Sequence, residues 1–177
     1  MNAESSTPPP QLARDLGLRY GLWLGGLLAL LEVAFFAIDQ YGETYTTVIN
    51  WSLGLLAMTW SAWQFRQQNQ GWMTLGQSFR VSLTTLVVGI GLQAIASALY
   101  TSLIDPQATE RYLTRMREDL LSQPQLAEEA IEMALSMTEK MSQPFIAVPL
   151  AIVSAAFGGS IAALIIGLLL QKRPDQG

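Results

Sequence analysis

The sequence predicts an all-α fold, a bundle of four transmembrane helices with an amphipathic helical hairpin in the long loop between the third and fourth. Two observations predict it. Half of the 177 residues are hydrophobic, and they are gathered into runs long enough to cross a bilayer, which takes roughly 20 residues per helix. The 14 acidic and 10 basic residues lie mostly between these runs. This segregation is typical of a multi-pass membrane protein.

Four runs define the predicted spans. They cover about residues 18–38, 46–65, 80–104 and 145–171. Glu32 is the one charge well inside a span, because the other charged residues lie at or beyond the ends of the runs. We expect one membrane domain over residues 17–171. Residues 1–16, rich in proline and hydroxyl side chains, are expected to form a disordered cytoplasmic leader, and residues 172–177 a cytoplasmic tail.

Basic residues set the predicted orientation. With four spans, the two termini and the second loop share one side of the membrane, and the first and third loops share the other. The first side holds Arg14, Arg19, Arg66, Arg80, Lys172 and Arg173. The first loop, residues 39–43, holds no base. Because basic flanks of short loops stay in the cytoplasm, both termini are predicted to be cytoplasmic and the loop of residues 105–143 to face outward.

Composition excludes several classes of function. The chain has no cysteine and no histidine, which removes thiolate and imidazole zinc sites and triads that use histidine as the base. The net charge of −4 leaves no basic excess for a phosphate backbone, so no nucleic-acid partner is expected. No cofactor or metal is expected. The polar residues Ser154, Ser160 and Asp105 show no spacing that pairs a nucleophile with a base, so an enzyme is not predicted.

Small residues spaced by four predict close helix packing in two spans. In the first span they are Gly17, Gly21 and Gly25, and in the fourth they are Ala151, Ala155, Gly159, Ala163 and Gly167. A spacing of four keeps each row on one helix face, and small side chains let backbones approach where lipid gives no hydrophobic drive. We expect these rows to pack within the chain, and an interface between copies of the chain is the alternative.

Glu32 is the most informative residue. At ~1.5 Å per residue it lies roughly 9 Å below the outer end of its span, where a carboxylate costs a few kcal/mol unless it is protonated, hydrated or hydrogen-bonded. Gln93 lies at the same depth in the third span. Asn50 or Ser52 in the second span, and Ser154 in the fourth, fall near this level. We predict a polar layer centred on Glu32 and Gln93. It serves either as protonated interhelical glue or as a proton or cation relay.

The long outward loop is predicted to be helical. Asp105-Pro106 is typical of a helix start, and Ser122 with Gln125 indicates a capping box before a second helix. The eight acids and four bases of this loop give it a net charge of −4. Apolar residues recur at helical spacing in both halves, and the second row contains Met133, Met137 and Met141. We interpret the methionines as an apolar face rather than a copper(I) site, and we expect the hairpin to lie over the outer surface of the bundle.

The order of short motifs along the chain resembles one known family. The motifs are Leu30-Leu31-Glu32, Met73-Thr74-Leu75-Gly76-Gln77-Ser78-Phe79-Arg80, Asp105-Pro106, Met141-Ser142-Gln143-Pro144-Phe145 and Gln171-Lys172-Arg173. In this order and spacing they resemble the bacterial integral membrane family catalogued as domain of unknown function 4199. The resemblance implies a four-span protein of the bacterial inner membrane and no particular activity.

Two functions remain open from the sequence. The first is a non-enzymatic scaffold or accessory subunit of a membrane assembly, which the small-residue faces and the amphipathic loop favour. The second is a small proton- or ion-coupled transporter that uses Glu32. Both place the protein in a lipid bilayer, as a homo-oligomer or within a larger complex. A tightly packed, dry bundle would favour the first function, and a water-accessible cavity that reaches Glu32 would favour the second.

Overall fold

The computed structural model describes residues 10–123 and 125–172 of the chain. Over these residues the fold is all-α, with six α-helices and one π-helical segment that extends α3. The elements are α1 (Pro10–Ala37), α2 (Thr44–Gln68), α3 (Leu75–Leu99), η1 (Tyr100–Ile104), α4 (Ala108–Leu121), α5 (Glu128–Met141) and α6 (Pro144–Leu170). The all-α prediction is confirmed.

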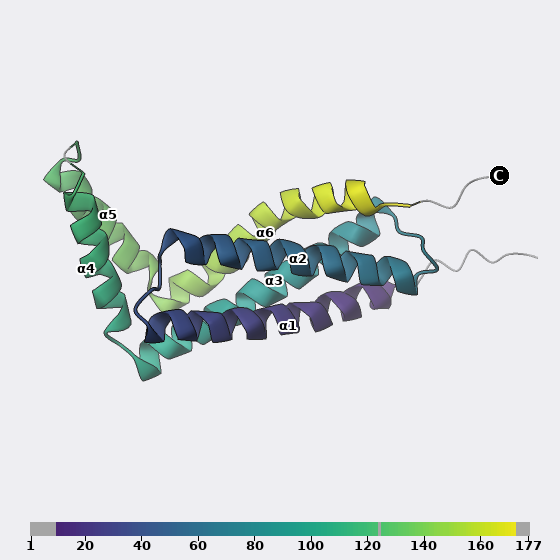
Figure 1. Cartoon of the computed structure of the whole chain (residues 1–177), viewed down its shortest axis with the longest axis horizontal. Coiled ribbons are helices and arrows are strands. Elements are labelled where there is room, and N and C mark those ends of the chain that lie inside the picture. Colours follow the sequence, from purple (N-terminus) through teal and green to yellow (C-terminus); the bar gives the residue numbers. More distant parts are fainter. Residues whose placement is uncertain (1–9, 124, 173–177) are drawn as a thin grey trace, which may run out of the picture.

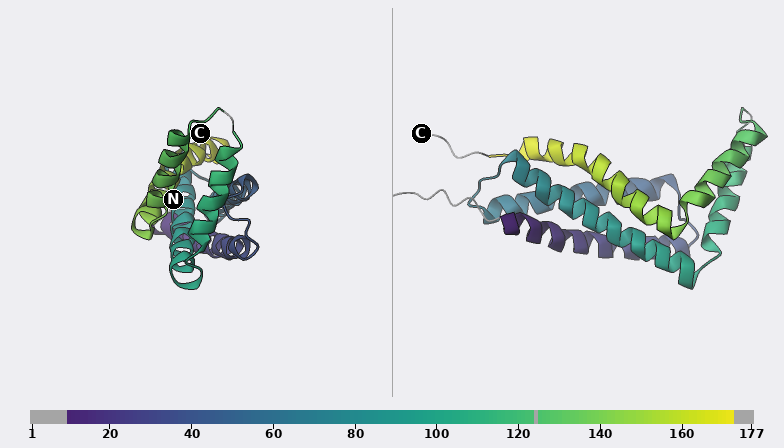
Figure 2. Two further views of the ribbon diagram at one scale, coloured as in Figure 1. Left: turned by 90° about the vertical axis from the view of Figure 1, so that its left-hand side faces the viewer. Right: turned by 180° about the vertical axis from the view of Figure 1, so that it is seen from behind.

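The four long helices form an elongated bundle. α1, α2, α3 and α6 alternate in direction along the chain, and α3 packs against each of the other three, most extensively against α1 and α6 (Figure 1). α4 and α5 form a hairpin at one end of the bundle (Figure 2). We call this the outer end. The opposite end, where α1 begins and α6 finishes, is the inner end.

Three helical segments are long and apolar enough to cross a membrane, which is the composition of a multi-pass membrane protein. They are Gln11–Ala37, Leu75–Ile104 and Pro144–Leu170. α2 is not among them, so the prediction of four apolar spans is wrong for the segment near residues 46–65. α2 has 25 residues, as α3 does. Asn50, three tryptophans and several threonine, serine and glutamine side chains dilute its apolar character.

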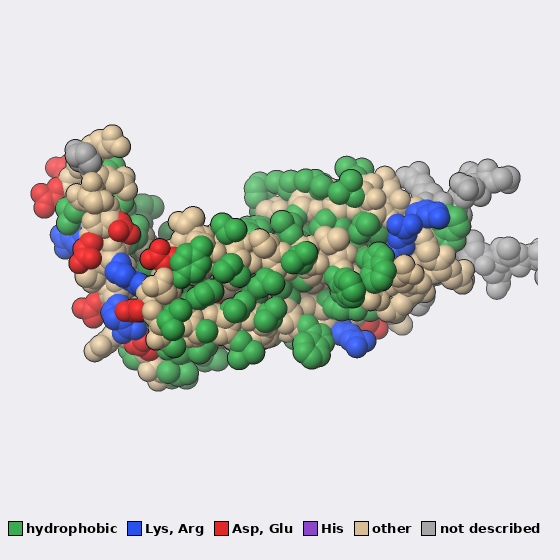
Figure 3. Space-filling model, viewed as in Figure 1, with side chains coloured by type: hydrophobic (Ala, Val, Ile, Leu, Met, Phe, Trp, Pro, Cys, Tyr) green, Lys and Arg blue, Asp and Glu red, His purple; other side chains and the backbone are tan. Residues whose placement is uncertain are grey.

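Charged side chains gather at the two ends of the bundle (Figure 3). The outer end carries the acids and bases of the hairpin, and the inner end carries mainly arginines. The surface between them is largely hydrophobic, and Trp23, Phe157 and Leu169 are among its most exposed side chains. An apolar belt of this extent suits the interior of a bilayer and not water.

α1 begins earlier than predicted. Residues 10–16, expected to belong to the disordered leader, form its first turns because Ala13 and Leu16 are buried in the core. Pro10 is tolerated at the start of a helix, where an N–H group would have no helical partner. Residues 1–9 of the predicted leader and 173–177 of the predicted tail lie outside the described residues.

The inner ends of α3 and α6 are joined. A capping box begins α3, in which the Thr74 hydroxyl accepts from the Gln77 N–H and the Gln77 side chain accepts from the Thr74 N–H. Just before it, Met73 and Lys172 exchange two backbone hydrogen bonds of 2.9 Å. The Lys172 ammonium also lies 5.3 Å from the centre of the Trp72 ring. These contacts fix the end of α6 to the loop that precedes α3.

The inner half of the bundle is closely packed. Met58, Ala62 and Val81 are completely buried. Hydroxyl groups join α2 to α3 within this core, where Thr85 donates to Ser61 at 2.9 Å and Ser61 donates to the Met58 carbonyl at 2.9 Å. Because these hydroxyl groups are paired, they stabilise the helix contact without needing water.

The ends of the hairpin helices differ from their prediction. Ser122 does not cap α5 but ends α4, and its hydroxyl donates to the Asp119 carbonyl at 2.6 Å. α5 begins at Glu128 without a side-chain cap on Ala127. The predicted capping box from Ser122 to Gln125 is therefore wrong. The acids in the first turn of α5 favour its start through the helix dipole instead.

The placement of the hairpin also differs from its prediction. It stands away from the end of the bundle instead of lying over the outer surface (Figures 1 and 2). Met133, Met137 and Met141 are 66%, 56% and 47% exposed. The apolar face that was expected to cover the bundle is thus uncovered within the described residues.

Candidate functional site

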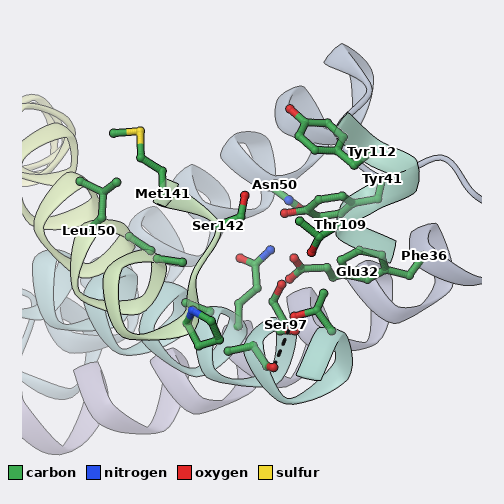
Figure 4. Close-up of a pocket in the computed structure, with 18 of the residues that line it drawn as sticks. Glu32, Phe36, Tyr41, Asn50, Ser97, Thr109, Tyr112, Met141, Ser142 and Leu150 are labelled. Carbon is green, nitrogen blue, oxygen red and sulfur yellow. Dashed lines mark hydrogen bonds between the residues drawn. The ribbon is translucent and has the colours of Figure 1, made fainter. Parts of the chain in front are cut away.

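A cavity of about 570 Å³ occupies the outer half of the bundle. All four long helices line it, together with the loop between α1 and α2 and the hairpin residues nearest the bundle. Figure 4 shows Glu32, Tyr41, Asn50 and Ser97 converging on this space. Side chains therefore do not fill the outer half of the bundle, whereas the core around Met58 and Val81 is closely packed.

Glu32 is buried in the cavity wall without a complete set of partners. Only 7% of its surface is exposed, and its Oε2 has no hydrogen-bond partner among the described residues. The same holds for Oδ1 of Asn50. A buried acceptor left unpaired costs about 1–3 kcal/mol. These two oxygens therefore mark where the contents of the cavity would form hydrogen bonds.

The structure brings together four of the five residues predicted for the polar layer. Glu32, Gln93, Asn50 and Ser154 all line the cavity. Ser52 lies outside it, exposed on α2, with its hydroxyl donating to a carbonyl one turn earlier at 2.7 Å. Residues that are two positions apart on a helix point in directions roughly 200° apart. Asn50 and Ser52 therefore cannot both face the bundle, and Ser52 is removed from the layer.

Ser97 and Tyr41 join the site although neither was predicted. Ser97 lies one turn beyond Gln93 on α3, and this spacing of four was an available signal. Tyr41 comes from the loop between α1 and α2. Burial, and then the negative charge of Glu32, raises the pKa of Tyr41 to about 12. Its hydroxyl therefore stays protonated and available as a donor at neutral pH.

Aromatic rings form one wall of the cavity. The Phe36 ring is stacked between Tyr41 and Tyr100, with centroid distances of 4.1 Å and 4.9 Å. Tyr112 of α4 meets Tyr41 edge to face at 5.8 Å. Tyr112 packs directly on Gly42, whose positive φ of 86° and lack of a side chain make room for the ring. This stack gives the cavity a rigid aromatic wall beside Glu32 (Figure 4).

A cluster of ion pairs, which we call the outer latch, ties α4 to the end of α1. Arg111 contacts Asp105 at 2.5 Å and Asp39 at 3.3 Å. Arg115 donates to the backbone carbonyls of Asp39 and Tyr41. The hydrogen bonds that Arg111 donates lower the pKa of Asp105, and the acceptors Asp105 and Asp39 raise the pKa of Arg111. The outer latch therefore stays charged at neutral pH and holds the base of the hairpin beside the cavity.

The predicted small-residue rows pack within the chain. A Cβ atom added to Gly17, Gly21 or Gly25 would lie 2.7 Å from a side chain of α3. Gly159 and Gly167 of α6 lie equally close to α3. In the same row of α6, Ala155 and Ala163 are buried, and Ala151 lines the cavity. Both rows thus hold α1 and α6 against α3, and this contact fixes the relative positions of Glu32 and Gln93.

Comparison with known proteins identifies the family. The model of Protein of unknown function (DUF4199) matches residues 19–172. The chain belongs to the DUF4199 family. The match begins within α1 of this DUF4199 protein and covers α2 to α6, including the hairpin and the residues that line the cavity. No curated protein and no solved structure matches the chain.

Proposed function

We propose that this DUF4199 protein is a non-enzymatic membrane protein that admits a cation or a proton-bearing group from its outer side and binds it at Glu32. The structure would then correspond to the outward-facing conformation of a small carrier. The observation that carries this proposal is the buried carboxylate of Glu32, unpaired at Oε2, in the wall of a 570 Å³ cavity. Ionisable groups at membrane depth that face a cavity are typical of ion and proton pathways.

The packing below Glu32 supports a binding chamber rather than an open channel. Leu28 lies one turn further in on α1 and is completely buried. Leu86 of α3, at 2% exposed, and Ala163 of α6, with no exposed surface, belong to the same core. A continuous pore would need a hydrated path on the inner side as well, and the Ser61 and Thr85 hydroxyl groups in that core are already hydrogen-bonded to each other. Passage inward would therefore require a second arrangement of the helices.

α2 is proposed as a fourth membrane-embedded helix despite its lower hydropathy. It runs alongside the three apolar helices over their length (Figure 1), and Val48, Leu55 and Leu56 are exposed on it.

We further propose that the membrane is the bacterial inner membrane, with the inner end in the cytoplasm, because that end carries mainly arginines. A cysteine in place of Gln68 should then react with an impermeant thiol reagent only after permeabilisation, and one in place of Glu129 without it. The reverse pattern would contradict this orientation.

Access to the cavity can be tested with single cysteines, since the chain has none of its own. We expect Asn50→Cys to react from the outer side with an impermeant thiosulfonate, and a positively charged reagent to react about 10-fold faster than a negatively charged one, because Glu32 attracts cations. Adding Glu32→Gln should remove this preference. The measurement is the rate of modification in intact spheroplasts.

Ser52→Cys is the matched control. It lies on the same helix two residues away, but its side chain is outside the cavity. It should react slowly with both reagents because the hydrophobic belt places it against lipid. Equal rates at positions 50 and 52 would show that water does not reach Glu32, and the carrier proposal would fail.

An accessory subunit is the second candidate, favoured by the uncovered methionine face of α5. Met133 and Met137 are more than half exposed, and methionine surfaces adapt readily to partners. We expect a protein to co-purify from native membranes and to be lost in Met133→Glu with Met137→Glu, as identified by mass spectrometry. Ser136→Glu, at an exposed polar position on the same helix, is the control. Recovery of the chain alone would count against this function.

A further inference from the structure

We propose that the outer cavity binds an organic ammonium ion, a primary amine that carries an apolar group, with Glu32 as its counter-ion. This inference rests on the proposed function and narrows it to one class of ligand. It is carried by three features of the cavity: its unpaired oxygens, its single carboxylate and its aromatic wall.

The unpaired oxygens require a ligand that donates hydrogen bonds. Oε2 of Glu32 and Oδ1 of Asn50 are acceptors, and both belong to residues that line the cavity. A primary ammonium group brings three N–H donors and a positive charge. It therefore has enough donors for both oxygens. Its positive charge also offsets the charge of the buried carboxylate, which a neutral ligand cannot do.

The single carboxylate disfavours a metal ion. The described residues contain no group of three acidic, histidine or cysteine side chains placed to hold a metal. Calcium needs six to eight oxygen ligands, usually from several carboxylates. An anion is disfavoured as well, because Glu32 repels it. The bases nearest the cavity, Arg111 and Arg115, are held by Asp39 and Asp105 in the outer latch.

The aromatic wall requires an apolar part on the ligand. Phe36, Tyr41 and Tyr112 lie on the same side of the cavity as Glu32, and Leu150 lies on its other side (Figure 4). A hydrated inorganic cation would leave the wall unused. A volume of about 570 Å³ is that of a pocket for a small organic molecule.

Benzylammonium is a suitable probe, and benzyl alcohol is its neutral control. With the protein in lipid nanodiscs at pH 7, titration calorimetry should show saturable binding of benzylammonium and at least 10-fold weaker binding of benzyl alcohol. Glu32→Gln should weaken benzylammonium binding by at least 10-fold. Ser52→Ala, outside the cavity, should leave it unchanged. If Glu32→Gln does not fold, as judged by thermal unfolding, Asn50→Leu replaces it, since it removes the second acceptor.

The outcomes separate the ligand class from the proposed function. Benzyl alcohol binding as tightly as benzylammonium, or full binding by Glu32→Gln and Asn50→Leu, would overturn the ammonium proposal. Absence of benzylammonium binding would overturn it too. In each case, cation-selective labelling of Asn50→Cys would show that the outward cavity itself remains. If that labelling is also absent, both proposals fail.

Discussion

Gly25→Ala should destabilise the bundle by about 1–3 kcal/mol, whereas Gly26→Ala should not. A Cβ atom on Gly25 would lie 2.7 Å from Cβ of Leu92 and 2.9 Å from the Gly89 carbonyl oxygen, and backbone of α3 cannot easily move away. Nothing lies within 4 Å of the same atom on Gly26. The measurement is the thermal unfolding midpoint in detergent, which should fall by roughly 2–12 °C for Gly25→Ala.

The two glycines are neighbours on one helix, so the comparison removes effects of helix propensity and membrane depth. Gly26→Ala should be neutral or raise stability by up to about 1 kcal/mol, because alanine is the better helix former. Equal losses in both variants would show that α1 does not meet α3 through its glycine face. The polar layer would then lose its structural basis, since this contact sets Glu32 beside Gln93.

Arg111→Ala combined with Arg115→Ala should release the hairpin from the end of α1. The two arginines supply the ion pairs to Asp39 and Asp105 and the hydrogen bonds to loop carbonyls. Spin labels on Thr44→Cys and Glu129→Cys would report the separation of hairpin and bundle. We expect one narrow distance distribution in the parent protein and a broad one in the double variant, because individual exposed ion pairs are weak but here several act together.

Arg117→Ala is the matched control for the outer latch. Within residues 10–123 and 125–172, the ion pair of Arg117 is to Glu132 of α5, inside the hairpin. The Arg117→Ala variant should therefore keep the distance distribution narrow. If the double variant also keeps a narrow distribution, the aromatic contacts of Tyr112 alone position the hairpin. The outer latch would then have no role in shaping the cavity.

Helix periodicity accounts for what could be predicted from the sequence. The glycine and alanine rows and the depth of Glu32, Gln93 and Asn50 follow from a constant rise and rotation per residue. The same arithmetic left Asn50 and Ser52 as alternatives, because depth alone does not say which face of α2 meets the bundle. The contact of α2 with α3 through Ser61 and Thr85 resolves this.

Features that depend on contacts between distant segments could not be predicted. The cavity lies between α2, α3 and α6 at the outer end. The spacing of residues along one helix does not predict such a gap between helices. The helical start at Pro10 depends on burial of Ala13 and Leu16 against other helices. The amphipathic character of α5 predicted a buried face, but amphipathicity does not identify what covers that face, and the methionines are exposed.

The closely packed inner half of the bundle has an electrical consequence. A membrane potential falls across material of low dielectric constant and hardly at all across water. A hydrated outer cavity would bring the external solution down to Glu32, so the whole voltage would drop across the core around Leu28, Met58 and Leu86. A single charge crossing that core would gain or lose about 2.3 kcal/mol per 100 mV. The closely packed core is thus the region in which the membrane potential would act on a cation released from Glu32.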